Sequence, residues 1–265
     1  MVMSSIHDFR IRAFDSTIQV AATCPDACSV LERYVFPTLP RTSRTVENAD
    51  ISIRIDRIAD QFQLSVDDAV VASNSQAIGL VPDIIRALDD AVIPRLTTLR
   101  AVHAGTVVWG GRAMLLPGVS HAGKSSLVAE LLRRGATYFS DEYALIDSEG
   151  CVHPYPRPLL VRNGFPEQFP MLADECNAPV GNAPTQVGWI LALQYLPASP
   201  WSVAPISQSE ALLTLLRNTP HVLAESPEMV NMFQCAVAGA VCCAGHRNEA
   251  AHAVDQIMQL VGITA

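Results

Sequence analysis

The spacing of hydrophobic residues changes several times along the chain, and each change marks an expected element. In the first hundred residues, apolar and polar positions alternate in three stretches, which predicts β-strands. From Ile78 to Leu96 the apolar positions recur every three or four residues, which predicts an amphipathic helix with Pro82 in its first turn. The strands are expected over 9–23, 51–55 and 61–71, and a short helix over 29–34. Residues 1–98 therefore read as a small α+β lobe.

The pattern after residue 98 begins with a hairpin. Two apolar runs, Thr106–Trp109 and Ala113–Leu116, flank Gly110-Gly111, a pair that permits positive φ at both turn positions. Leucines and Val128 at helical spacing then predict a helix that ends at Gly135. Further strands are expected over 136–140, 143–147, 151–153 and 187–196, and helices over 207–217, 225–237 and 248–261. Residues 154–158 are too rich in proline for regular structure, and 164–184 are expected to form a mobile flap.

The turn between the hairpin and the helix carries the first candidate chemistry. Residues 118–125 fit the pattern G-x-x-x-x-G-K-[ST] of a phosphate-binding loop, and a strand before it with a helix after it is the context that this motif requires. Its backbone N–H groups and the helix N-terminus are expected to bind phosphate oxygens. The residues assigned to the nucleotide are Gly118, Ser120, His121, Ala122, Gly123, Lys124, Ser125 and Ser126. Lys124 is expected to reach the β and γ phosphates.

A carboxylate pair follows the loop. Asp141 and Glu142 stand at the end of the strand over 136–140, where they can bind Mg²⁺ and accept a proton. Ser125 and Asp141 are assigned to the metal and Glu142 to proton transfer, although the two carboxylates are interchangeable at this level. His103, at the start of the hairpin, is a candidate to tune a carboxylate or phosphate, with a core histidine as the alternative.

Three further side chains near the motif remain open. Arg157 and Arg162 are candidates to neutralise phosphate charge or to dock the acceptor, and ordinary surface arginines are the alternative. His121 lies inside the loop, but no step of the chemistry needs it.

The composition of the chain indicates which kinds of partner and which cellular compartment to expect. The chain is 49% hydrophobic and 17% charged, which favours a well-packed protein over a disordered one. A net charge of −8 without a basic block argues against nucleic acid. The apolar stretch over 232–244 is too short to cross a membrane, and the first residues lack the apolar core of a signal peptide. Seven irregularly spaced cysteines suggest reduced thiols in a cytoplasm and no zinc site.

Taken together, the histidine at the start of the hairpin, the phosphate loop, the short helix and the carboxylate pair resemble the catalytic domain of HPr kinase/phosphorylase. The resemblance is greatest to the stand-alone kinases related to it, some of which phosphorylate a serine of ribosomal peptides such as lasso peptides. It covers about residues 99–162, with the segment 155–158 also similar to the stand-alone relatives. It implies an α/β fold whose P-loop kinase core is of the HPr kinase/PEP carboxykinase type, spanning 99–265.

The chain also departs from that family. His121 replaces a usual glycine, Ser126 a frequent glutamate and Glu142 a usual aspartate. The glycine-rich segment with Glu-x-Arg-Gly is missing, which argues against phosphorolysis and against HPr as the substrate.

The expected function is therefore that of an ATP- and Mg-dependent kinase. It would transfer the γ-phosphoryl group to a hydroxyl, most simply a serine of a small protein or peptide, with homo-oligomers possible as in the bifunctional relatives. A nucleotide-binding regulator without transfer and a small-molecule kinase of the same fold are the alternatives. The sequence does not name the acceptor.

Overall fold

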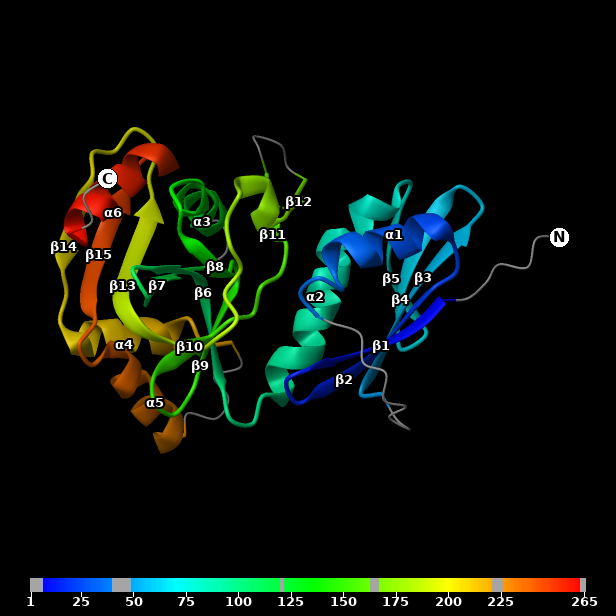
Figure 1. Ribbon diagram of the computed structural model, residues 1–265, viewed down its shortest axis with the longest axis horizontal. Coiled ribbons are helices and arrows are strands. Elements are labelled where there is room, and N and C mark those ends of the chain that lie inside the picture. Colours follow the sequence, from blue (N-terminus) through cyan, green and yellow to red (C-terminus); the bar gives the residue numbers. More distant parts are fainter. Residues whose placement is uncertain (1–6, 40–48, 120–121, 163–166, 221–225, 263–265) are drawn as a thin grey trace. The chain divides into compact units, whose positions relative to one another are not determined.

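The computed structural model describes residues 7–39, 49–119, 122–162, 167–220 and 226–262 (Figure 1). The chain divides into two compact units, which are Met1–Thr97 with Arg162–Pro170, and Thr98–Val161 with Met171–Ala265. The sequence placed Arg162–Pro170 in the second lobe, whereas this segment groups with the first unit.

The first unit is built on a five-stranded sheet in the order β1-β2-β3-β4-β5. Its elements are β1 (His7–Ala13), β2 (Ser16–Ala22), α1 (Pro25–Tyr34), β3 (Ile51–Ile58), β4 (Gln61–Val66), β5 (Ala69–Asn74), the 3₁₀ turns Ala77–Leu80 and Ile93–Arg95, and α2 (Val81–Val92). The predicted long helix is thus a shorter α-helix with a 3₁₀ turn at each end, and Pro82 lies in its first turn. The α+β character expected for this lobe is confirmed.

The second unit contains an eight-stranded sheet with the main order β10-β9-β6-β7-β13-β15-β14, to which β8 is added beside β6. Its strands are β6 (Arg100–Trp109), β7 (Arg112–Pro117), β8 (Thr137–Ser140), β9 (Tyr143–Ile146), β10 (Cys151–His153), β11 (Leu159–Val161), β13 (Thr185–Tyr195), β14 (Ser202–Pro205) and β15 (Val241–Arg247), while β12 (Phe169–Met171) lies where the chain returns from the first unit. Its helices are α3 (Lys124–Arg133), α4 (Gln208–Arg217), α5 (Pro227–Val237) and α6 (Ala250–Leu260), with a 3₁₀ turn over Ala173–Cys176. The chain is therefore of the mixed α/β class.

Helices cover both faces of this sheet (Figure 1). Along β7, Met114 and Leu116 pack with α3 and α6, whereas Ala113 and Leu115 pack with α4 and α5, because successive side chains of a strand point to opposite faces. Strand β13 runs parallel to both β7 and β15. The carboxyl ends of these three strands therefore lie on one edge of the sheet, where ligands bind in open α/β sheets.

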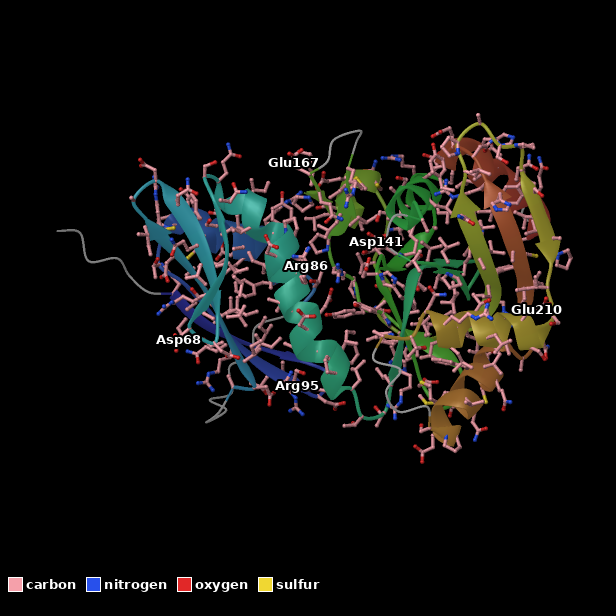
Figure 2. All side chains as sticks on the ribbon, turned by 180° about the vertical axis from the view of Figure 1, so that it is seen from behind. Asp68, Arg86, Arg95, Asp141, Glu167 and Glu210 are labelled. Atoms are coloured by element: carbon pink, nitrogen blue, oxygen red, sulfur yellow. The ribbon has the colours of Figure 1, made fainter. Side chains whose placement is uncertain are left out.

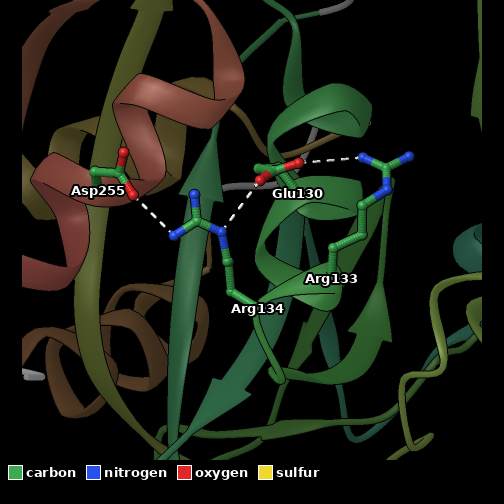
Figure 3. Close-up of polar contacts among 4 residues, drawn as sticks. All are labelled: Glu130, Arg133, Arg134 and Asp255. Carbon is green, nitrogen blue, oxygen red and sulfur yellow. Dashed lines mark hydrogen bonds and ion pairs between the residues drawn. The ribbon is translucent and has the colours of Figure 1, made fainter. Parts of the chain in front are cut away.

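An ion-pair network joins α3 and α6, which cover the same face of the sheet (Figure 3). Arg134, directly after α3, donates to Asp255 of α6 at 2.8 Å and to Glu130 of α3 at 3.3 Å, and Arg133 donates to the same glutamate at 3.3 Å. These side chains are partly exposed, so the apolar contacts between α3 and α6 contribute more to stability than the ion pairs do.

One prediction is wrong, and one strand inside the sheet was missed. The segment 164–184 is not a simple flap over its described part, because Ala173, Cys176 and Ala178 are buried in the core beside α3. Strand β15 was not predicted at all, although it lies inside the sheet between β13 and β14. The hairpin of β6 and β7 is confirmed, with Gly110 at φ +53° and Gly111 at φ +76°.

Candidate functional site

The phosphate-loop motif joins the carboxyl end of β7 to the first residue of α3. Gly118 starts the loop, and its N–H donates to the His103 carbonyl at 3.2 Å. Gly123 ends it with φ +77°, a left-handed conformation that favours glycine. Ser120 and His121, two of the predicted nucleotide-binding residues, lie outside the described residues. Strand, glycine turn and helix therefore follow one another as the motif requires.

Lys124 is buried and folded back onto the loop. Its ammonium group donates to the carbonyls of Gly118 at 2.8 Å and Val119 at 3.2 Å. Burial lowers the pKa of Lys124, and the negative charges of Glu142 and Asp141 oppose that effect. The three side chains are thus close enough to influence one another's charge.

Asp141, labelled in Figure 2, follows β8. It is almost fully buried, with 3% of its surface exposed. Burial raises the pKa of its carboxyl to about 6, and the charge of Glu142 adds to this, while hydrogen bonding to Ser125 and the charge of Lys124 act in the opposite direction. Its Oδ1 atom is buried without a hydrogen-bond partner among the described residues. Such an atom is costly in a folded protein, which makes it a candidate ligand atom.

Glu142 is paired with His103. The Nε2 atom of His103 contacts the Oε1 atom of Glu142, and the imidazole ring packs against Tyr143 with centroids 5.7 Å apart. Burial acts to raise the pKa of Glu142, but the hydrogen bond and charge of His103, with the charge of Lys124, outweigh it and lower the pKa. His103 also fixes its backbone in place, because its N–H donates to the Asn218 carbonyl at 2.7 Å. It is therefore a partner of a site carboxylate and not an isolated core histidine.

The remaining predicted residues fall into two groups. Ser125 is half-buried in the first turn of α3 and hydrogen-bonds Asp141, while Ser126 beside it is exposed and Ala122 precedes Gly123 in the loop. The two candidate arginines, Arg157 and Arg162, lie in different units. Arg157 is buried in the second unit, where its backbone carbonyl accepts a hydrogen bond of 2.6 Å from Tyr138, but Arg162 is exposed and belongs to the first unit.

Arg247 contacts the phosphate-loop motif, although the sequence did not predict it there. It is the last residue of β15, only 2% of its surface is exposed, and its guanidinium donates to the Gly123 carbonyl at 2.7 Å. Because the strand itself was not predicted, this arginine was not among the candidate residues. The signal was a short apolar run, Val241–Ala244, that follows Gly239 and ends near a charged residue.

The oxygen atoms near the phosphate loop determine whether a metal ion could bind there. The described residues contain no group of three or more His, Cys, Asp or Glu side chains that could hold a metal ion. Mg²⁺ in phosphoryl-transfer sites needs fewer, because one or two carboxylates suffice when water and substrate phosphates supply the other ligands. The Ser125 hydroxyl and the unpartnered Oδ1 atom of Asp141 fit that requirement.

Neither the protein-family models nor the curated proteins include a match to this chain. In the part of the chain that the structure describes, the helices are all too short or too polar to pass through a lipid bilayer.

Proposed function

We propose that the chain is an ATP-dependent kinase that transfers the γ-phosphoryl group to a hydroxyl, most simply a serine of a small protein or peptide. One observation carries this proposal. A buried carboxylate with an unpartnered oxygen, Asp141, lies beside the lysine and serine of a phosphate-loop motif. A surface turn that matched the motif by chance would not need a buried, destabilised acid next to it.

The loop and Lys124 supply binding and charge. Backbone N–H groups at the start of α3 would hold phosphate oxygens, and the Lys124 ammonium, now bonded to two loop carbonyls, would turn to the β and γ phosphates. Phosphoryl transfer needs little covalent help from a protein, since positioning and charge neutralisation lower most of the barrier. These residues are sufficient for that part of the reaction.

Mg²⁺, when bound by Ser125 and Asp141, would neutralise charge on the transferring group. The burial of Asp141 suits this role, because a nearby cation offsets the desolvation of a carboxylate. The Oδ1 atom of Asp141, which has no hydrogen-bond partner among the described residues, would then coordinate the ion.

Glu142 is the proton acceptor in this proposal. Its Oε1 atom is held by His103, which leaves Oε2 to take the proton of the acceptor hydroxyl as the new P–O bond forms and the bond to ADP breaks. The lowered pKa of Glu142 keeps it ionised at neutral pH, ready to accept. His103 positions the carboxylate through this contact.

We also propose that the second unit is a P-loop kinase core of the HPr kinase type. Support comes from the order of its parts, which are the hairpin beginning near His103, the loop, α3 and the acids after β8.

The test uses γ-labelled ATP with Mg²⁺ and serine-containing peptides, including any encoded beside the gene. We expect transfer by the wild-type chain, and loss of at least two orders of magnitude for Lys124→Ala and Asp141→Asn. Asp255→Asn is the matched control, because this aspartate is on α6 and pairs only with Arg134 among the described contacts. Phosphosites are mapped by mass spectrometry.

The outcomes separate the candidate functions. Tight nucleotide binding without transfer to any peptide or metabolite would favour a regulator. Transfer that survives Asp141→Asn at the wild-type rate would contradict the role given to Asp141.

A further inference from the structure

The strongest feature outside the predicted site is the buried guanidinium of Arg247. A fully buried arginine is uncommon, and most examples are paired with a carboxylate. Here both terminal nitrogens donate to backbone carbonyls, Nη2 to Gly123 at 2.7 Å and Nη1 to Asn248 at 2.7 Å. Among the described contacts of Arg247 there is no ion pair with a carboxylate. The direct hydrogen bonds to its charge therefore come from peptide carbonyls, with the Glu249 carboxylate and Tyr195 acting on it without such a direct pair.

The position of this cation is specific to the phosphate loop. Gly123 is the left-handed residue through which the loop enters α3, and its carbonyl also accepts the Leu127 N–H at 3.3 Å. A Cβ atom at Gly123 would lie 2.4 Å from Nη2 of Arg247, so the guanidinium packs directly on this glycine. The arginine thus holds the peptide group that sets the direction of the first N–H groups of α3.

The fold around Arg247 keeps it there. It pairs in register with Tyr195 across the parallel strands β13 and β15, and its guanidinium lies 5.2 Å from the centre of that ring. The Tyr195 hydroxyl in turn donates to Glu249 at 2.7 Å. Both strands end on the edge of the sheet from which the loop leaves β7. A rigid element, and not a flexible loop, therefore presents the charge to the loop.

We propose that Arg247 is a positioning residue for the phosphate loop, one that fixes the Gly123 carbonyl and supplies a buried positive charge that bound phosphates compensate. The second half of this inference rests on the proposed nucleotide site, whereas the first half does not. Burial disfavours the charged arginine, and a polyphosphate beside the loop would offset that cost. Such a ligand explains why a buried guanidinium without a direct ion pair among the described contacts is kept at this place.

The first experiment needs no nucleotide. Amide hydrogen exchange is followed at Leu127 in the wild type, in Arg247→Met and in Arg247→Lys, with Arg134→Met as the control, since Arg134 is bonded only to side-chain carboxylates in the described contacts. We expect exchange at Leu127 to accelerate about tenfold in Arg247→Met and to be unchanged in the control. Amides of β6 serve as the reference for overall stability. Equal protection of Leu127 in wild type and Arg247→Met would overturn the proposal.

The second experiment measures the Kd of ATP with Mg²⁺ for the same proteins. We expect about a tenfold weaker Kd for Arg247→Met and a partial recovery in Arg247→Lys, which keeps the charge but not the planar pair of donors. Millimolar guanidinium chloride should strengthen binding to Arg247→Ala, and the same concentration of sodium chloride should not. A merely structural role would not give this rescue.

The two readouts keep the two proposals apart. If Leu127 responds but the wild-type chain binds no nucleotide, the proposed function fails and the positioning role stands. If the wild-type chain binds ATP and Arg247→Met binds it equally well, the charge-compensation role is overturned.

Discussion

At the scale of single residues, the burial of Asp141 in the candidate site is unfavourable for the free energy of folding. A carboxylate is most stable in water or beside a cation, yet this one is buried and one of its oxygens has no partner among the described residues. Burial raises its pKa to about 6, so part of the population is protonated near neutrality in the absence of a ligand. Active sites commonly contain such destabilised groups, because the ligand restores the missing interactions.

Replacing Asp141 by asparagine should therefore stabilise the metal-free protein at neutral pH. The folded-state pKa lies above the unfolded value of 3.8, so the folded protein binds the proton more tightly and wild-type stability falls as pH rises from about 4 to about 6. Asparagine removes this dependence. Integrated over the interval, the shift corresponds to a gain of about 2 kcal/mol for Asp141→Asn at pH 7 relative to pH 4. Urea unfolding with EDTA at the two pH values measures it, and a wild-type stability that rises over this range relative to Asp141→Asn would contradict the expectation.

Lys124 is open to a direct chemical test, because it is the single lysine of the chain. Its lowered pKa raises the fraction of neutral, nucleophilic amine at a given pH. We expect acylation of Lys124, read by peptide mass, to reach half its maximal rate at a lower pH than an exposed lysine side chain does, and to slow when ATP and Mg²⁺ are added. The Lys124→Arg variant has no lysine, so its labelling measures the acylation of the N-terminal amine alone. Labelling that ATP does not slow would argue against a nucleotide at this loop.

At the scale of elements, the sequence predicted those that have a local pattern of turns or of helical spacing. It missed a strand inside the sheet that has no such pattern. Glycine pairs, prolines and helical spacing predicted the hairpin, the loop and α3, and so placed Lys124 and Asp141 near one another. Strand β15 was missed because it is buried among β13, β14 and helices, so its apolar run continues that of α5 without alternation. The burial of Cys176 was missed for a similar reason, since a polar segment with small apolar residues gives no periodic signal.

The turn between β9 and β10 offers a prediction at this scale. Gly150 has φ +78°, and a Cβ atom there would lie 2.4 Å from the backbone nitrogen of Ala236 in α5. Gly111 has φ +76° in the β6–β7 turn, with open space around it. Both alanine variants should lose about 1 kcal/mol from the left-handed backbone, and Gly150→Ala should lose about 2 kcal/mol more from the clash with α5. Denaturant unfolding of the two variants measures the difference, and equal losses would show that the turn does not pack on α5 as described.

At the scale of the whole molecule, the two units differ in the signals that report on them. Each has a buried core of its own, with residues such as Ile53 and Leu64 in the first unit and Leu131 and Leu191 in the second. The three tryptophans, Trp109, Trp189 and Trp201, all belong to the second unit, which carries the phosphate-loop motif. Tryptophan fluorescence therefore follows the unfolding of that unit, whereas far-UV circular dichroism follows both.

This difference gives a test of where the nucleotide binds. A ligand that binds the folded second unit stabilises it by about 2.7 kcal/mol at a concentration of 100 times its Kd. We expect ATP with Mg²⁺ to raise the midpoint of the fluorescence transition by several degrees, because 1 kcal/mol shifts the Tm of a domain of this size by about 2–4 °C. Lys124→Ala should abolish the shift while its unliganded transition stays cooperative. If ATP moved only the part of the circular dichroism signal that fluorescence does not follow, the nucleotide would bind the first unit, and the phosphate loop would lose its assigned role.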